Sequence, residues 1–438
     1  MNQLDIDITS DSSSKNVYQK TKLATKYIPL DQMRSNYRVL NNESDILAEA
    51  HQLFAKRMSF ESFNLESMIE LESVLRNVLT INPKNSRLKY ELAFVLIQNK
   101  PTRKSLLLAE KLLTESLAQD LFNEEILTVE IRMKAKRLGK LVEKMLAQSA
   151  FIDNNQSIRR VNWALFNQCP MICKGCYNTF TSQHLTFKQA KMVIDKLVDQ
   201  GVKELVVSGG DPILSPYIYE FIDYAHKKNL LLGIDTTGYT LNEEILRYCS
   251  DKICYLGLPI DGSTNQIQNA FRHGPKDILH KANQNFKLSE SLGIPVKINT
   301  TVSRHNLNDL IEIGKIIERY QHIKHWSLFK WWEIRSTNKI RNEMYVSEDE
   351  AILKIDELKQ YFPLLDIRYR TPYDRELSHF FIQSNGQVVT FGSEVEEEII
   401  LGHILKDPIK KILRSPALDK NSPKFQSVSR FKVKSCDG

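Results

Sequence analysis

Six short apolar runs between residues 161 and 332 alternate with amphipathic stretches, and this alternation constrains the fold of the 438-residue chain more than any other feature. An apolar strand followed by an amphipathic helix predicts a βαβ unit, a parallel sheet and right-handed crossovers. Six such repeats favour an open, partial (β/α)6 barrel over residues 155–335 rather than a closed eight-fold one. In such folds the functional residues lie at the C-terminal ends of the strands. The strands are expected at 161–166, 204–208, 230–236, 253–260, 295–302 and 325–332.

The chain before the barrel has a different composition. None of the 16 glycines precedes Gly139, and none of the six cysteines precedes Cys169. Residues 1–45 are polar and rich in Ser, Asn and Asp, which predicts a disordered or loosely ordered arm. Residues 46–150 carry apolar positions at helical spacing and predict an all-α domain that weakly resembles tetratricopeptide repeats. This domain is either a groove that docks a peptide or protein partner, or a plain helical cap on the barrel, which the irregular period favours.

Charge and hydropathy narrow the class of protein. No apolar run reaches the ~18 residues that span a bilayer, and the N-terminus lacks the layout of a signal peptide. We therefore expect a soluble, cytoplasmic protein without a membrane partner. The net charge of +7 would suit an acidic partner, but a mildly basic surface is the simpler interpretation, and nucleic acid is not indicated. In a reducing compartment the six cysteines indicate metal ligands or thiols rather than disulfides.

Three of these cysteines follow the first predicted strand at C-x3-C-x2-C spacing: Cys169, Cys173 and Cys176. Soft thiolate ligands select iron–sulfur clusters or zinc. Three local ligands would leave one iron of a four-iron cluster open to a further ligand. A zinc knuckle or scattered core thiols are the alternative, although a zinc site closed by local ligands usually has four.

The triplet at the end of a first barrel strand resembles the radical S-adenosylmethionine (radical SAM) superfamily, and the resemblance extends over about residues 160–335. It implies a [4Fe–4S] cluster whose open iron chelates the amino and carboxylate groups of S-adenosylmethionine. In that family an electron from the cluster cleaves the sulfonium, and the resulting 5′-deoxyadenosyl radical abstracts a hydrogen atom from substrate. The resemblance also implies a reducing partner such as flavodoxin or ferredoxin.

Further segments look like the cofactor contacts of this family. Gly209, Gly210 and Asp211 close the second strand and resemble its Gly-Gly-Glu motif, with the shorter Asp in place of Glu. Two glycines permit close approach of backbone to a ligand. Where many members have an aromatic residue against the adenine, immediately before the third cysteine, this chain has Gly175. The resemblance then leaves the adenine contact to Tyr177.

The next three strands end in similar motifs. Thr237 lies in a turn like the family's Thr-Asn-Gly, and Asp261 and Arg272 resemble its Asp-Gly and Arg-x-Gly elements. By this match Arg272 pairs with the methionine carboxylate, which suits a bidentate guanidinium; the alternative is a solvated helix residue. Asn299 belongs to a Lys-Ile-Asn segment similar to that of viperin-like members, where the Asn contacts the cofactor. The alternative for Asn299 is a structural role in which its side chain makes its hydrogen bonds to backbone groups.

The last predicted strand mixes aromatic with charged residues, which suits a substrate pocket. Lys330 and Glu333 are the catalytic candidates there, whereas Trp331 and Trp332 individually favour packing. Cys436, near the C-terminus, is a candidate hydrogen-atom donor.

Residues 336–438 predict a C-terminal extension that covers the open side of the barrel. Cys436 is the only cysteine in it, so we predict a single cluster. Cys249 and Cys254, at the far end of the fourth strand, are expected to be buried structural thiols. The elements of the extension are expected at 347–360 (helix), 366–370 (strand), 380–391 (hairpin) and 407–415 (helix).

Three functions follow from these features. The first is an enzyme that uses the adenosyl radical on a small metabolite or a peptide. The second is an activase that installs a glycyl radical on a partner enzyme, because segments around Cys176 and Asp211 closely resemble the activating enzymes of anaerobic ribonucleotide reductase. Those proteins are much shorter than this chain. The third is a non-enzymatic metal-binding interaction protein in which the helical domain acts.

Overall fold

The computed structural model describes residues 43–57, 65–119, 129–149, 158–176, 178, 183–275, 277–333, 340–392, 398–419, 422 and 425. Contacts divide the chain into two compact units, residues 1–150 and 151–438. Within the described ranges no helix is both long and apolar enough to cross a bilayer.

The first unit is helical, in agreement with the pattern of residues 46–150. Its helix α5 is buried over nearly its whole length, and Asn85 begins it by accepting a hydrogen bond from the Leu88 N–H at 2.8 Å. Lys89 of α5 is 4% exposed and pairs with Glu115 of α6 at 2.9 Å. The tetratricopeptide-like character stays a prediction. The helices are α3 (Glu43–Arg57), α4 (Leu65–Ile81), α5 (Ser86–Gln98), α6 (Arg103–Gln119) and α7 (Val129–Ser149).

Most of the predicted arm lies outside the described residues, but its last three residues do not. Glu43–Asp45 form the start of α3, so this helix begins earlier than predicted. The composition did not indicate this helix start, because acidic residues and Ser have two interpretations. They are typical of disordered segments, and they are also the residues that favour a helix N-terminus.

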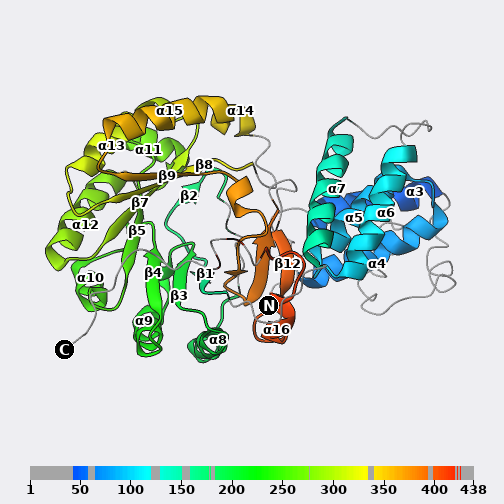
Figure 1. Cartoon of the computed structure of the whole chain (residues 1–438), viewed down its shortest axis with the longest axis horizontal. Helices are drawn as coiled ribbons and strands as arrows, with labels where there is room; N and C mark the ends of the chain where they lie inside the picture. Colours follow the sequence, from blue (N-terminus) through cyan, green and yellow to red (C-terminus); the bar gives the residue numbers. More distant parts are fainter. Residues whose placement is uncertain are drawn as a thin grey trace, which may run out of the picture. The chain divides into compact units, whose positions relative to one another are not determined.

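The second unit is built on a ten-stranded sheet in the described residues, with the order β12-β11-β10-β1-β3-β4-β5-β7-β8-β9 (Figure 1). The six predicted strands are neighbours in the predicted order and are all parallel. They are β1 (Arg160–Phe166), β3 (Glu204–Gly209), β4 (Leu231–Asp235), β5 (Tyr255–Pro259), β7 (Val296–Val302) and β8 (His325–Lys330). A separate antiparallel pair joins β2 (Ile172–Cys173) to β6 (Arg272–His273).

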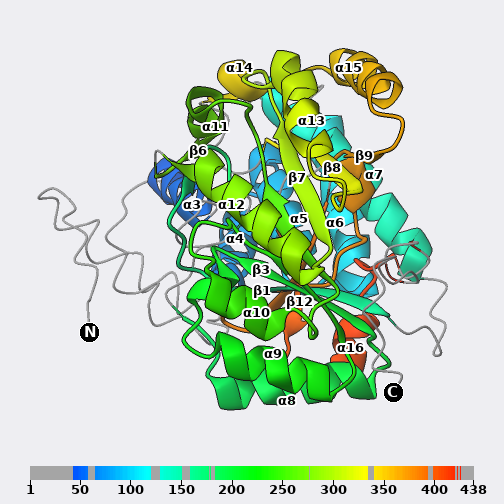
Figure 2. The same ribbon diagram turned by 90° about the vertical axis from the view of Figure 1, so that its left-hand side faces the viewer.

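Helices between the strands cover one face of this sheet, as Figure 2 shows for α8, α9, α10, α12 and α13. They form where expected because apolar residues recur on one helix face, and a capping box of Thr186 and Gln189 begins α8. Trp163 of β1 packs edge-on against Phe221 of α9, with ring centroids 5.5 Å apart. The helices are α8 (Phe187–Asp199), α9 (Ile218–Lys227), α10 (Glu243–Cys249), α11 (Asn265–Phe271), α12 (Ile278–Leu292), α13 (Leu310–Glu318), α14 (Arg341–Met344), α15 (Glu348–Tyr361) and α16 (Ile409–Leu413).

The C-terminal segment adds strands to both edges of the sheet. β9 (Asp366–Arg370) pairs with β8, at the residues predicted for a strand. The hairpin of β10 (Phe381–Ile382) and β11 (Gln387–Phe391) continues into β12 (Glu398–His403), and β10 pairs with β1. β12 escaped prediction because its apolar residues follow an acidic run that is typical of surface loops. The idea that this segment covers the open side of the barrel stays a prediction.

Candidate active site

A cavity of about 530 Å³ lies at the C-terminal ends of strands β1, β3, β4, β5, β7 and β8. This is the end at which sheets of this kind bind ligands. The site residues that the sequence predicted and that line this cavity are Cys169, Cys173, Cys176, Gly209, Gly210, Thr237, Arg272, Asn299 and Lys330.

The loop after β1 carries the three cysteines, which are all partly buried. Within it, Cys173 pairs in register with Arg272 through the short strands β2 and β6, and the Lys174 N–H donates to the Phe271 carbonyl at 3.0 Å. Burial raises the pKa of the Cys169 thiol to about 12. Burial also raises the pKa of Cys173, and the neighbouring Arg272 partly opposes this. The loop is therefore anchored to the end of α11, and its thiols are partly shielded from water.

These residues fit an iron–sulfur cluster by their donor chemistry. Among the described residues, no three His, Cys, Asp or Glu side chains gather round a single ion. In an iron–sulfur cluster each thiolate binds a different iron atom, so the ligands need not surround one point and can be spread along a loop. The three thiols share one cavity wall with Arg272 and with the indole of Trp331, whose buried Nε1 has no partner among the described residues. Thiol ligands beside an unsatisfied N–H group suit a cluster whose sulfur atoms can accept a hydrogen bond.

The two glycines at the end of β3, Gly209 and Gly210, are needed for a reason that the sequence did not indicate. A Cβ on Gly209 would overlap the Phe166 carbonyl oxygen, and one on Gly210 would overlap the carbonyl oxygens of Asn167 and Gln168. The Gly210 N–H donates to Phe166 O at 2.8 Å. Close approach to a ligand was the expected reason. The structure shows close approach to the backbone that leads into the cysteine loop.

Asp211 lies behind the cavity wall. Its side chain is fully buried and accepts hydrogen bonds from the hydroxyl groups of Thr236 at 2.6 Å, Thr237 at 2.5 Å and Thr240 at 3.2 Å. Burial raises the pKa of Asp211, and these hydrogen bonds oppose the rise. The predicted direct contact between Asp211 and a cofactor is not supported by this placement, because Thr236 and Thr237 form the wall in front of it.

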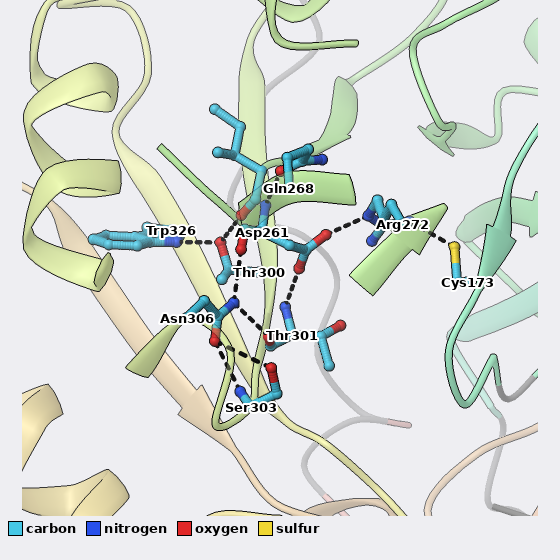
Figure 3. Close-up of polar contacts among 10 residues, drawn as sticks. Cys173, Asp261, Gln268, Arg272, Thr300, Thr301, Ser303, Asn306 and Trp326 are labelled. Carbon is cyan, nitrogen blue, oxygen red and sulfur yellow. Dashed lines mark hydrogen bonds and ion pairs between the residues drawn. The ribbon is translucent and has the colours of Figure 1, made fainter. Parts of the chain in front are cut away.

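Asp261 also lies behind the wall, at the centre of the network in Figure 3. Its carboxylate accepts from the Thr301 N–H at 2.6 Å and pairs with Arg272. Its backbone N–H donates to Gln268 Oε1 at 2.6 Å, and its carbonyl accepts from Asn306 Nδ2 at 2.9 Å. Together these contacts link Asp261 to β7, to the loop after β7 and to the segment of α11 and β6 that carries Arg272.

Arg272 is on the wall itself, and its Nη1 lies 3.7 Å from Cys173 Sγ. Burial alone would lower the pKa of Arg272, but Asp261 and Cys173 raise it above its usual value. The guanidinium is therefore a fixed positive charge between a buried carboxylate and a predicted cluster ligand. The alternative of a solvated helix residue is wrong.

Asp235 of β4 and Asn299 of β7 also line the cavity. Asp235 Oδ1 accepts from Lys297 Nζ at 3.0 Å and from Asn299 Nδ2 at 3.2 Å. Asn299 Oδ1 is buried without a partner among the described residues, which leaves an acceptor available to a bound molecule. Sequence reasoning did not select Asp235 or Lys297. The signal was present for Lys297, since residues two apart in a strand point to the same face as Asn299.

The remaining candidates are distributed differently. Lys330 lines the cavity and pairs with Glu348 at 2.6 Å, whereas Glu333 pairs with Arg341 and is not among the lining residues. Arg375, from the C-terminal segment, also lines it, and no local motif indicated this. Tyr177 and Cys436 lie outside the described residues. Cys249 and Cys254 are buried, as predicted, and burial raises the pKa of both to about 12.

Comparison with known proteins agrees with this geometry. The model of the radical SAM superfamily matches residues 163–317, the stretch that holds all three cysteines and both Asp261 and Arg272. The chain contains a radical SAM domain. The chain is 27% identical over 213 residues to an S-adenosylmethionine-dependent nucleotide dehydratase of Flammeovirga pacifica, covering 45% of this chain and 72% of the relative. It is 24% identical over 220 residues to the mycofactocin maturase MftC of Mycobacterium tuberculosis, covering 47% of this chain and 56% of the maturase.

A solved structure shares the fold of this chain. The crystal structure of Streptococcus suis SuiB bound to precursor peptide SuiA matches with a TM-score of 0.50 and 14% identity, over 80% of this chain and 85% of that one. The domain and the relatives named as a dehydratase and a maturase identify this chain as an enzyme. The alternative of a non-enzymatic interaction protein is thereby wrong.

Proposed function

We propose that this radical SAM protein binds one [4Fe–4S] cluster through Cys169, Cys173 and Cys176, and uses S-adenosylmethionine to remove a hydrogen atom from a peptide or small-metabolite substrate. One observation carries the proposal: the three cysteines line the same cavity as Thr237, Arg272 and Asn299. When bound, the cluster supplies the electron that cleaves S-adenosylmethionine into methionine and the 5′-deoxyadenosyl radical.

The polypeptide holds and orients the cofactor in this proposal. Arg272, fixed by Asp261, offers a positive charge on the wall beside Cys173. Asn299 Oδ1 offers a buried acceptor, and Gly209 and Gly210 support the backbone at the start of the cysteine loop. These groups suit a molecule with carboxylate, ammonium and hydroxyl groups. The guanidinium can pair with a carboxylate, and the amide oxygen can accept a hydrogen bond from an ammonium or hydroxyl group.

A peptide is the substrate class that we place first. One relative is named as a maturase, and a solved structure with this fold holds a precursor peptide. A small metabolite is the alternative, since another relative is named as a nucleotide dehydratase. The helical first unit would be the site of peptide or protein capture, and a flavodoxin or ferredoxin in the cytoplasm would be the reductant. No observation favours the glycyl-radical activase.

Anaerobic reconstitution with iron and sulfide tests the proposal. The protein is then mixed with S-adenosylmethionine and a reductant, and 5′-deoxyadenosine is quantified by mass spectrometry. We expect about four irons per chain, and 5′-deoxyadenosine from the wild type but not from Cys173→Ala. A colourless, zinc-loaded protein that forms no 5′-deoxyadenosine would contradict the proposal.

The substrate class has its own test. 5′-Deoxyadenosine that carries deuterium from a labelled peptide would identify a peptide substrate, and deuterium transfer from labelled nucleotides would favour the small-metabolite alternative. A glycyl-radical signal in electron paramagnetic resonance, formed on a partner protein, would instead support the activase.

A further inference from the structure

Trp331 places an unsatisfied donor beside the cysteine loop. The residue is 4% exposed, and its indole Nε1 is buried with no hydrogen-bond partner among the described residues. The ring packs in a cluster with Phe271 and Met344 that also contacts Cys173. A buried N–H without a partner is costly, so native structures usually provide one from protein, water or a bound group. Trp331 lines the cavity, where a bound group would lie.

Gly175 fixes how the indole meets this loop. It stands between Cys173 and Cys176 and has φ of +73°, a left-handed conformation that favours glycine. A Cβ at this position would lie 2.5 Å from Trp331 Nε1 and 3.3 Å from Cε2. The absence of a side chain at Gly175 therefore lets the nitrogen edge of the indole rest on the loop that carries the cysteines.

The same part of the loop already receives one nitrogen donor, since Arg272 Nη1 lies 3.7 Å from Cys173 Sγ. Trp331 directly follows β8, so it reaches the loop from a different strand than Arg272, which belongs to β6. Hydrogen bonds to the sulfur atoms of a cluster stabilise its more negative, reduced state and so raise its reduction potential.

We propose that Trp331 Nε1 donates a hydrogen bond to a sulfur atom of the cluster site at the Cys173–Cys176 loop and thereby raises the reduction potential of the cluster. This inference rests on the proposed function, because it requires the cluster. Trp331 is a positioning and tuning residue in it. The easier reduction would help a soluble electron donor to deliver the electron that the reaction needs.

The test is a redox titration of the reconstituted full-length enzyme without S-adenosylmethionine, followed by absorbance and by electron paramagnetic resonance. We expect the cluster of Trp331→Phe to titrate at a more negative potential than the wild type, with equal iron and sulfide content. Trp332→Phe is the matched control. Its indole lines the same cavity and also has a buried, unpartnered Nε1, but it packs edge-on against Phe391, 5.5 Å between centroids, and should titrate as the wild type does.

A second variant and a second measurement guard against misfolding. Gly175→Ala keeps Trp331 but displaces its Nε1, so it should shift the potential in the same direction. In wild-type protein exchanged into D2O, pulsed electron paramagnetic resonance should detect a deuteron coupled to the reduced cluster that is lost in Trp331→Phe.

Each outcome decides between the two proposals. If the cluster of Trp331→Phe had the wild-type reduction potential, the tuning role would be overturned. A shift of the potential that appears only with S-adenosylmethionine present would also overturn it, because the indole N–H would then donate to S-adenosylmethionine and not to the cluster. A wild-type protein that assembles no four-iron cluster would instead overturn the proposed function.

Discussion

Arg272 lies directly opposite Cys173: the two residues pair in register between β6 and β2, and Nη1 of the arginine is 3.7 Å from the cysteine sulfur. This relationship joins the segment after β5 to the cysteine loop. Asp261, two residues after the end of β5, pairs with the guanidinium from behind the cavity wall. The charge on the cavity wall is thus positioned by a carboxylate that does not itself line the cavity.

Replacing this carboxylate should destabilise the protein and weaken cofactor binding. Asp261→Asn leaves Arg272 as an uncompensated charge, and breaking a buried pair in this way costs about 3–5 kcal/mol. We expect the free energy of unfolding to fall by that order and the Kd for S-adenosylmethionine to rise. Urea unfolding followed by tryptophan fluorescence measures the first, since all four tryptophans lie at or after residue 163 in the second unit.

The control for Asp261→Asn is Glu243→Gln, which breaks an exposed pair with Arg247. Exposed pairs contribute only about 0.3–0.5 kcal/mol on a helix. Equal losses in the two variants would show that Asp261 has no special role.

Gly257→Ala should disturb the wall of the cavity. A Cβ there would overlap Asp235 Oδ1 and lie 3.1 Å from Asn299 Nδ2, so the Asp235 carboxylate, which also pairs with Lys297, must shift. Overpacking of this kind costs about 1–3 kcal/mol. We expect lower formation of 5′-deoxyadenosine together with lower stability.

Gly139→Ala is the matched control for Gly257→Ala, because a Cβ at Gly139 of α7 meets nothing within 4 Å. An added methyl there should stabilise the helix by about 0.5–1 kcal/mol. If Gly257→Ala bound S-adenosylmethionine and turned over like this control, the polar wall of Asp235 and Asn299 would not belong to the site.

Asn299→Ala should weaken cofactor binding without unfolding the protein. Its Oδ1 is a buried acceptor with no partner among the described residues, and a hydrogen bond lost there is worth about 1 kcal/mol. We expect the Kd for S-adenosylmethionine, from equilibrium dialysis of the reconstituted protein, to rise roughly five-fold. An unchanged Kd would assign Asn299 a structural role with Asp235.

His322 makes the stability of the second unit depend on pH. Burial lowers the pKa of His322 below its usual value of 6.5, and Glu290 partly opposes this. Between that lowered value and about 6.5 the unfolded chain binds a proton that the folded protein refuses, so stability falls as the pH drops through this range. In urea unfolding at a series of pH values, His322→Gln should show a flatter profile than the wild type. Profiles of equal slope would contradict this assignment.

Local patterns determined much of this protein. The alternation of apolar strands with amphipathic helices predicted all six central strands, because period and capping are properties of neighbouring residues. The strand at Asp366–Arg370 was located to the residue for the same reason. The cysteine spacing identified the predicted cluster ligands, since three ligands within eight residues need no distant contact to meet.

Only the tertiary structure decided which side chains share the cavity. Asp211 and Asp261 follow their strands like cofactor ligands, yet both lie behind the wall and position threonines and Arg272. The contact of Trp331 with Gly175 joins positions more than 150 residues apart, and the pairing of β10 with β1 joins positions more than 200 apart. Such contacts depend on how strands and loops pack in three dimensions, and a local sequence pattern does not indicate which distant residue each side chain will contact.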